Sequence, residues 1–339
     1  MNLDFGTCLE NLTLEDKFSY RFRAYVSPLI ALIGIPANSL AIFVFLSIQC
    51  TNPCRFNVYA IGLLLDHNVQ LIINAFMDDF LGRGIIWATE CSVTSRLNNM
   101  SSFSCKAITF LTNCSALCRA FVMVVFSTDR VFTTYHSRRI NPKHGLPIAY
   151  SAVVLCYTVS LVLYFPDLYL VDRVQTNNGQ FLCRYQDPTS QGALYVTYLY
   201  IVVATLAPTL YVFITNNMII AKLKSVVRSE RLVRKNTKMI TVEFGKMMAH
   251  LLIGTTFSLL SLPLVVTLIL KQQAESKAHK CSSNSIYLNK IVGLTKLFSS
   301  LDTINYAVEF FIYAGFMPDF RKKLSTLCQC MFKLRKFGE

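Results

Sequence analysis

The sequence predicts an all-α membrane protein, a seven-transmembrane helix bundle followed by a short C-terminal amphipathic helix. Composition is the first indication: 53% of the 339 residues are hydrophobic and only 15% are charged, against about 25% charged in a typical soluble domain. The mean hydropathy of +0.43 agrees with this. The second indication is a series of seven apolar stretches, each of roughly 20 residues or more, which is the length that a helix needs to cross a bilayer.

The predicted elements follow in order along the chain. Residues 1–23 form a polar arm that lacks the apolar core of a cleavable signal peptide. The spans are expected at residues 24–49, 57–82, 102–135, 147–166, 193–224, 241–270 and 288–314. Residues 318–339 interleave basic residues with Leu and Phe, which is typical of a helix in the membrane interface. We therefore expect an extracellular arm (1–23), a bundle (24–317) and a cytoplasmic amphipathic helix with a short tail (318–339).

The distribution of charge predicts the orientation of the bundle. With the N-terminus outside, nearly all of the formal net charge of +14 falls in the inner loops and the C-terminal segment. Inner loops of membrane proteins carry an excess of Lys and Arg, so this orientation explains the basic composition without any binding of nucleic acid. We expect a multi-pass protein of the plasma membrane, surrounded by membrane lipids, with its N-terminus outside.

The third span carries charges that an ordinary apolar helix would not. Arg119 lies in its middle, and Asp129 and Arg130 lie at its inner end. At about 1.5 Å per residue, Arg119 is roughly 16 Å from Arg130 along the helix axis. Ionisable residues within a membrane are costly and mark functional sites by default. The other ionisable residues expected within the membrane are Asp66 in the second span and Glu309 in the seventh.

Five cysteines lie on the predicted outer side, where disulfides persist. They are Cys8, Cys91, Cys105, Cys183 and Cys281. A bridge between Cys8 and Cys281 would tie the arm to the last outer loop, but connectivity does not follow from sequence alone. None of the cysteines has the spacing of a zinc site, and we expect neither a metal nor a cofactor.

The chain also carries signals for covalent modification on both sides of the membrane. Asn11 begins an Asn-Leu-Thr triplet, which is a glycosylation acceptor if the arm is outside. Cys328 and Cys330 lie in the interfacial helix and suit palmitoylation. The alternative is that both remain ordinary reduced thiols.

The seven spans, the outer Cys105 and Cys183, and the Asp-Arg-Val run at 129–131 together resemble the rhodopsin-like (class A) G-protein-coupled receptors, over about residues 24–331. The nearest resemblance is to neuropeptide receptors of the FMRFamide-like sort. It implies a disulfide between Cys105 and Cys183. The chain departs from the family pattern where Ser261 replaces the usual tryptophan of the sixth helix. The matching residues in the other helices are Asn38, Asp66, Pro208, Phe257, Pro263, Asn305, Tyr313, Phe320 and Arg321.

The resemblance implies a conformational switch at the inner end. Arg130 is expected to pair with Asp129 and with Glu243 of the sixth helix, as a latch that holds the resting state. Ligand binding would swing the sixth helix outward about Pro263, close to Phe257, because a proline frees a backbone carbonyl and tolerates bending. This swing would admit a heterotrimeric G protein. The alternative is a plain surface ion pair, worth about 0–1 kcal/mol.

The resemblance also implies a polar core between the second, third and seventh helices, where receptors of this family hold a sodium ion. A guanidinium offers five donors in a planar fork, so Arg119 is expected to replace the sodium ion and to bridge Asp66 and Glu309. The alternatives are that Arg119 pairs with one acid only or extends toward the interface. The full set of expected core residues is Asn38, Asp66, Arg119, Asn305, Glu309 and Tyr313.

Comparison with the family also bears on the ligand. Thr112 stands where aminergic receptors carry an aspartate, and Thr303 stands where opsins carry a lysine, so we expect neither an amine nor retinal. Charges of both signs near the outer ends suit a peptide, and Asp78 or Asp79 is expected to bind a cationic group of that peptide. The alternative is that these two acids are simply solvated. The residues expected to bind ligand are Asp78, Asp79, Thr112, Asn113, Arg184, Tyr200, Leu264 and Ser299.

The sequence therefore predicts a receptor that binds an extracellular ligand, with a neuropeptide as the leading class, and activates a heterotrimeric G protein. A chemosensory or lipid receptor is the alternative within the same fold. A multi-span transporter is less expected, because such folds usually show internal repeats and this chain shows none. An enzyme is not expected, because the five histidines are scattered over different spans and form no catalytic group.

Overall fold

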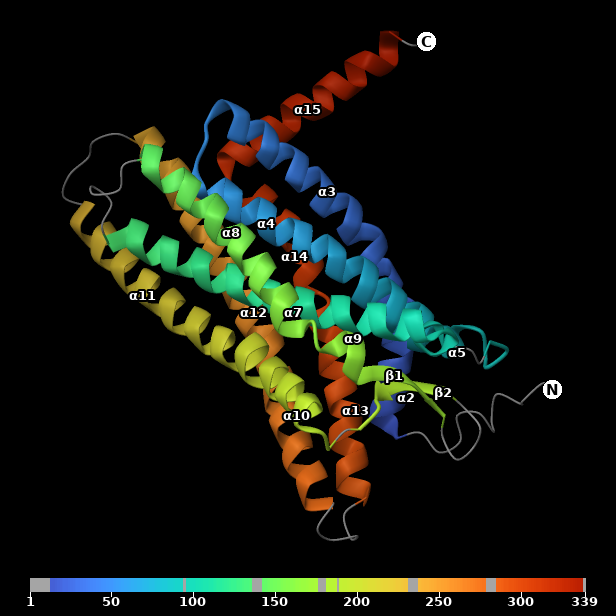
Figure 1. The fold of residues 1–339 in the computed structure, drawn as a ribbon. Helices are drawn as coiled ribbons and strands as arrows, with labels where there is room; N and C mark the ends of the chain where they lie inside the picture. The colour runs from blue at the N-terminus through green and yellow to red at the C-terminus, as the bar shows by residue number, and fades with distance from the viewer. Residues whose placement is uncertain are drawn as a thin grey trace.

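The computed structural model describes residues 13–93, 96–135, 142–175, 181–187, 189–230, 237–278 and 285–337 of the chain. Long helices run beside one another and form a bundle (Figure 1). Cys8, Asn11 and Cys281, which carry predicted modifications or bridges, lie outside the described residues.

The first half of the chain forms three long helical segments. The first consists of α2 (Leu14–Arg21), the π-helical η1 (Phe22–Val26) and α3 (Ser27–Thr51). The second consists of α4 (Arg55–Gln70), the π-helical η2 (Leu71–Gly84) and α5 (Ile85–Ala88). A short α6 (Leu97–Met100) then leads into the third, α7 (Ser102–Tyr135), which has the bounds that the sequence predicts.

The second half begins with the fourth helix, α8 (Pro142–Tyr164), and the short α9 (Asp167–Leu170). An antiparallel hairpin follows, of β1 (Val171–Gln175) and β2 (Phe181–Tyr185). The fifth segment consists of α10 (Gln191–Tyr198), η3 (Leu199–Leu206) and α11 (Ala207–Glu230), and the sixth is α12 (Thr237–Ala278). The chain continues through α13 (Ser285–Asp302), α14 (Asn305–Phe316) and α15 (Pro318–Phe337).

Six helical segments of the described chain are long and apolar enough to cross a membrane. The seventh segment is divided, because α13 ends at Asp302 and α14 begins at Asn305, with a turn between them. The sequence predicts one continuous helix over 288–314, so this interruption is a difference. With α13 and α14 as the seventh member, the predicted seven-helix bundle is confirmed.

The N-terminal helix begins earlier than the sequence predicts. Helix starts at Leu14 rather than at residue 24, so residues 14–23 are not the polar arm that was expected. The Thr13 side chain caps this helix by accepting a bond of 3.2 Å from the backbone N–H of Asp16. Segment α2 packs against α13, and the polar residues Asp16 and Arg23 are buried there. Asp16 forms an ion pair with Lys296 of α13, and Arg23 of η1 forms a buried ion pair with Asp79.

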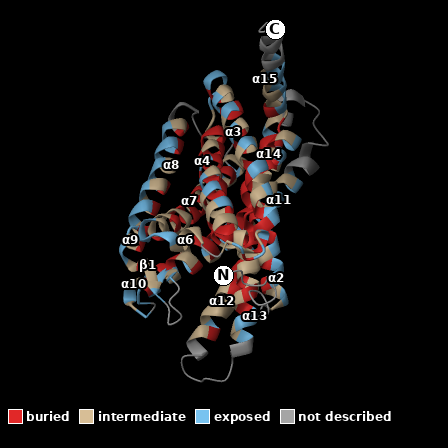
Figure 2. Ribbon diagram, turned by 90° about the vertical axis from the view of Figure 1, so that its right-hand side faces the viewer, coloured by how far each residue is buried: buried red, intermediate tan, exposed pale blue. Residues whose placement is uncertain are grey.

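The bundle has two ends that differ in structure. The β1–β2 hairpin and α2 lie toward one end, which we call the hairpin end (Figure 1). The helix α15 leaves the bundle at the other end, which we call the α15 end. Buried residues gather where helices face one another, and the outward faces are exposed (Figure 2). Leu32, Phe43, Val154, Phe213 and Leu259 are examples of large apolar side chains on these exposed faces, as expected for helices surrounded by lipid.

The core near the α15 end is a cluster of aromatic rings from five helices. Phe45 packs against Tyr313 and Phe320, with ring centroids 4.8 and 5.1 Å apart. Phe56 packs against Phe126 at 5.1 Å. All five rings are fully buried, so the cluster ties α3, α4, α7, α14 and α15 together. This packing fixes the position of the part of α7 near the α15 end, where the Asp-Arg pair lies.

Candidate functional site

A cavity of about 420 Å³ opens at the hairpin end. Its walls come from α2, η1, η2, α6, α7, β2 and α13. Cys105, at the start of α7, forms a disulfide with Cys183 of β2, and the two Cα atoms are 5.4 Å apart. The backbone N–H of Cys183 also donates to the side-chain oxygen of Asn99 at 3.0 Å. These two bonds hold the hairpin against the cavity, which we call the hairpin cavity.

The acidic side chains at this cavity are bound to basic side chains of the same chain. Asp78 lies in the wall, 2.9 Å from Arg83, and it also accepts a bond from Asn98. Asp79 is buried, and its Oδ1 is 3.0 Å from Nε of Arg23. Arg23 in turn donates to the Ser300 hydroxyl at 2.7 Å. Both acids therefore have internal partners, and neither is free to be solvated.

The approach of the first two helices makes the buried pair of Arg23 and Asp79 possible. Gly84 lies at the end of η2, next to the backbone of η1. A Cβ at this position would lie 2.5 Å from the carbonyl oxygen of Arg23. Only glycine allows this close contact between two backbones. A second pair closes the same side of the cavity, where the Lys296 ammonium is 3.0 Å from Asp16 of α2.

Four of the eight predicted ligand residues line the hairpin cavity, and four do not. The four that line it are Asp78, Thr112, Asn113 and Arg184. The prediction is wrong for Asp79, because its carboxylate is buried in the pair with Arg23. Tyr200, Leu264 and Ser299 lie on helices of the bundle but are not among the described residues that line this cavity. The sequence did not show which level of each helix the cavity reaches.

The hairpin itself carries a compact group of charges. Asp172 of β1 lies directly opposite Arg184 of β2 in the strand register. Asp172 accepts a bond of 2.6 Å from the Ser102 hydroxyl and lies 3.3 Å from the Lys106 ammonium. The bond from Ser102, with help from the backbone N–H of Arg173 and from Lys106, lowers the pKa of Asp172 to about 2. This carboxylate is therefore ionised and already bound to other groups.

Arg119 lies in the middle of the bundle and is paired with Asp302 at the end of α13. Its Nη2 is 3.0 Å from the Asp302 carboxylate, and both side chains are about nineteen-twentieths buried. Asp302 also accepts bonds from Ser261 at 2.9 Å and from Asn305 at 2.7 Å. The guanidinium lies over the ring of Tyr306, 4.7 Å from its centroid. Such contacts with aromatic faces stabilise a cation by about 0.5–2 kcal/mol.

The predicted bridge from Arg119 to Asp66 and Glu309 is therefore wrong. Asp66 accepts a bond of 2.6 Å from Ser115 instead, and Glu309 accepts a bond of 3.3 Å from the Tyr313 hydroxyl. Arg119 and Glu309 only share the lining of a cavity of about 10 Å³. The physical reason is the break in the seventh helix, because it places a closer carboxylate beside Arg119. No sign of this break was visible in the sequence, because Asp302 and Asn305 both fall inside a span that was expected to be one continuous helix.

The other predicted core residues are buried with polar or apolar partners. The Asn38 amide donates to the carbonyl of Tyr306 at 2.7 Å, next to the break between α13 and α14. Phe257 of α12 lies beneath the Arg119 guanidinium, 5.1 Å from it. Pro263 lies inside α12, two residues beyond Ser261. The sixth helix thus contacts the central ion pair through Phe257 and through the Ser261 hydroxyl.

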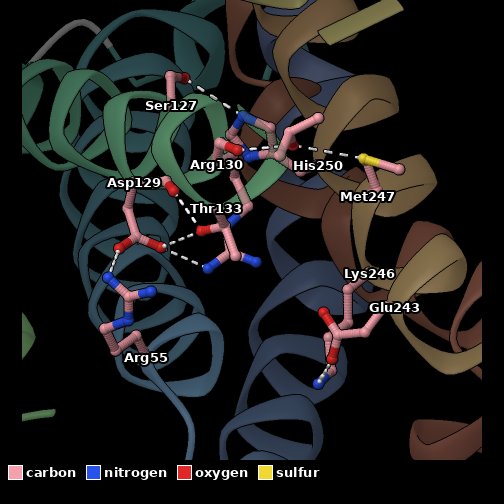
Figure 3. A network of polar contacts seen from close by, with 10 residues as sticks. Arg55, Ser127, Asp129, Arg130, Thr133, Glu243, Lys246, Met247 and His250 are labelled. Carbon is pink, nitrogen blue, oxygen red and sulfur yellow. Dashed lines mark hydrogen bonds and ion pairs between the residues drawn. The ribbon is translucent and has the colours of Figure 1, made fainter. Parts of the chain in front are cut away.

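At the α15 end, Asp129 forms ion pairs with two arginines. Its carboxylate pairs with Arg130, the next residue of α7, and with Arg55 at the start of α4 (Figure 3). Arg130 also lies over the Phe56 ring, 5.4 Å from the centroid. Thr133 donates to the backbone oxygen of Asp129. The pairing of Arg55 was missed from the sequence, because the limits of the predicted spans do not show which basic residue lies nearest to α7.

The predicted pair between Arg130 and Glu243 is absent from the described residues. Glu243 pairs with Lys246 on its own helix at 2.7 Å (Figure 3). The physical reason is proximity, because residues three apart on a helix are neighbours. Glu243 and Arg130 both line a cavity of about 170 Å³. This cavity lies between α4, α7 and α12 at the α15 end.

The cysteines offered for modification are described only in part. Cys328 is an exposed free thiol on α15. The side chain of Cys330 lies outside the described part of the structure. Cys91 is disulfide-bonded, whereas the suggested bridge between Cys8 and Cys281 falls outside the described residues.

The comparisons with known proteins agree with this arrangement of helices. The family model of the 7 transmembrane receptor (rhodopsin family) matches residues 72–302. This range begins in the second helical segment and ends at the Arg119 partner Asp302. No curated protein is similar enough to the chain to be counted as a relative.

Proposed function

Since the chain belongs to the rhodopsin family of seven-transmembrane receptors, we propose that it is a plasma-membrane receptor that binds an extracellular ligand and activates a heterotrimeric G protein. In this proposal the hairpin end faces outward and the α15 end faces the cytoplasm. The positive charge of the α15-end loops supports this orientation. The disulfide between Cys105 and Cys183 supports it too, because disulfides persist outside the cell.

The observation that carries the proposal is a single helix that contacts both ends. Segment α7 lines the hairpin cavity through Ile108, Thr109 and Thr112. The same helix carries Arg119 at its middle and Arg130 at the α15 end. A ligand that shifts α7 or α12 would therefore act on the Arg119–Asp302 pair and, through the rigid helix, on the group around Asp129.

We propose a peptide as the class of ligand. The hairpin cavity has a volume within the range of about 300–1,000 Å³ found for ligand sites. Most of its lining residues are charged or carry amide or hydroxyl groups, and Ile108 and Leu182 are the large aliphatic members. A lipid would leave these polar groups without partners, which is costly. The composition of the wall therefore supports a polar ligand over the alternative of a lipid.

The test is a coupling assay in cells that express the full chain. Sensors for each class of heterotrimer are combined with a library of secreted peptides, and the variant Arg130→Gln is the control at matched surface expression. We expect at least one peptide to activate one class of heterotrimer through the parent and not through the variant. Activation of no class by any peptide, or an equal response from Arg130→Gln, would contradict the proposal.

A further inference from the structure

The hairpin cavity keeps an excess of positive charge after the ion pairs in and behind its wall are taken into account. Five cationic side chains line the cavity, and Asp78 is the one acid among the described lining residues. Arg83 is paired with Asp78 at 2.9 Å. Arg23 is paired with the buried Asp79, and Lys296 is paired with Asp16, both at 3.0 Å. These pairs neutralise three of the five cations and use Asp78, the acid among the described lining residues, together with Asp79 and Asp16 behind the wall.

Two arginines remain without an acidic partner among the described residues. Arg96 is half-buried just before α6, and its side chain donates a hydrogen bond of 3.5 Å to the Tyr20 hydroxyl. Arg184 is exposed on β2 and has no ion pair. The acid opposite Arg184 in the hairpin is Asp172, which is bound to Ser102 and Lys106 instead. Counted over the described part of the chain, the cavity therefore has a surplus of two positive charges.

The same cavity offers a further group that suits an oxyanion. The Thr112 hydroxyl lines the cavity, is buried, and has no hydrogen-bond partner in the part of the chain that the structure describes. A buried polar group without a partner costs about 1–3 kcal/mol, so a ligand oxygen that binds this hydroxyl gains that contribution. Arginine presents a planar fork of donors that matches carboxylate, sulfate and phosphate groups. A cationic ligand would meet only repulsion from the two arginines.

We propose that the hairpin cavity recognises an anionic group of the ligand, with Arg96 and Arg184 as its binding residues and Thr112 as an additional donor. This inference rests on the proposed receptor function and makes it more specific. It replaces the expectation that Asp78 or Asp79 binds a cation. The chemical class is an organic anion, such as a peptide with a free terminal carboxylate or an acidic side chain.

The test measures the electrostatic preference of the cavity directly. The variant Thr112→Cys places a thiol in the wall of the full-length chain in lipid nanodiscs. Its reaction rates with an anionic (sulfonatoethyl) and a cationic (trimethylammonioethyl) methanethiosulfonate are measured by peptide mass spectrometry, which separates this thiol from the native cysteines. The ratio of the two rates is divided by the same ratio for a small thiol in solution.

We expect the normalised ratio to favour the anionic reagent by about tenfold or more, because two nearby charges act with opposite sign on the two reagents. Arg96→Gln and Arg184→Gln should each lower the ratio, and the double variant should bring it close to one. The matched control is Arg173→Gln, which removes the same charge from the neighbouring strand at a position that does not line the cavity. A ratio near or below one in the parent would overturn the proposal, as would a thiol that neither reagent reaches.

A second measurement identifies the kind of anion. Labelling of Thr112→Cys by the neutral reagent iodoacetamide is followed in the presence of N-acetylphenylalanine, its amide, or inorganic phosphate. Protection by the free acid and not by the amide supports a carboxylate site. Protection by phosphate alone assigns the site to phosphate groups, and equal protection by acid and amide would contradict recognition of an anion.

The outcome of this test is separable from that of the proposed function, because neither measurement needs a G protein. A ratio that favours the anion together with no coupling would leave the anion site in place and overturn the receptor assignment. Coupling to peptides together with a ratio near one would keep the receptor and overturn the anion site.

Discussion

The central ion pair makes a quantitative prediction about stability. The variant Asp302→Asn leaves the Arg119 guanidinium buried without a counter-charge, and its Nε and Nη1 atoms already lack partners. A guanidinium does not give up its proton in a protein, so the charge remains. Removal of one partner from a buried pair costs about 3–5 kcal/mol. We expect a loss of this size in the free energy of unfolding, measured by titration with SDS from mixed micelles.

Removal of the arginine instead of the carboxylate should lower the free energy of unfolding by a smaller amount. Arg119→Met leaves the Asp302 carboxyl in place, where it keeps the bonds from Ser261 and Asn305 and can take up a proton. We therefore expect a loss of about 1–3 kcal/mol, the cost of a polar group with an incomplete set of partners. The double variant Arg119→Met/Asp302→Leu removes both charges and should be more stable than Asp302→Asn alone.

A matched control separates this account from the pairing expected from sequence. Asp66→Asn changes a carboxylate that accepts one bond, from Ser115, so its loss should be about 0.5–1.5 kcal/mol. If Asp66→Asn costs as much as Asp302→Asn, Arg119 is bound to Asp66 and the reasoning is refuted. A loss below about 1 kcal/mol for Asp302→Asn would also refute the pairing of Arg119 with Asp302, since removing one partner of a buried ion pair costs about 3–5 kcal/mol.

Three further predictions follow from the described contacts. Cys105→Ser should lower the free energy of unfolding by about 2–5 kcal/mol, because it opens a disulfide between residues 78 apart in sequence. The same titration should find the stability of the control Cys328→Ser, at an exposed thiol, unchanged. Equal losses for both variants would contradict the prediction. Asp79→Asn should cost about 3–5 kcal/mol by leaving the Arg23 charge buried, and the prediction fails if Arg23→Met does not restore part of that stability. Glu243→Ala should leave ligand-independent signalling near the parent value, because Glu243 pairs with Lys246 of its own helix and its carboxylate is about half exposed, where ion pairs are worth about 0–1 kcal/mol. A large rise at matched surface expression would restore the latch with Arg130.

The fold could be predicted from the sequence because a bilayer requires each spanning helix to have a certain length and an apolar composition, and both are visible in a short stretch of residues. The bounds of α7 agree with the predicted span over 102–135, and the six long apolar segments coincide with predicted spans. The start of the first helix could not be found in this way. Asp16 and Arg23 read as a polar arm, and their partners Lys296 and Asp79 lie far away in sequence.

The same limit explains the errors in the candidate site. Sequence reasoning selected Arg119 as a buried cation that needs an acid, and the structure gives it one. The choice between Asp66, Glu309 and Asp302 depends on how α13 and α14 are set against α7. That geometry follows from tertiary packing around the break in the seventh helix, and no periodicity in the sequence encodes it. Arg55 and its pairing with Asp129 were missed for the same reason.

The most direct test of the receptor assignment needs no ligand. Purified chain in nanodiscs is mixed with each class of heterotrimer, and uptake of a non-hydrolysable GTP analogue is timed for the parent, for Asp129→Asn and for Asp129→Asn/Arg130→Gln. Asp129 holds both Arg130 and Arg55, so its neutralisation frees the arginine that faces the α15-end cavity. We predict that Asp129→Asn accelerates uptake by at least one class of heterotrimer above the parent rate, and that the added Arg130→Gln abolishes the acceleration. Uptake that stays at the rate of the heterotrimer alone for all three proteins and every class would contradict the account.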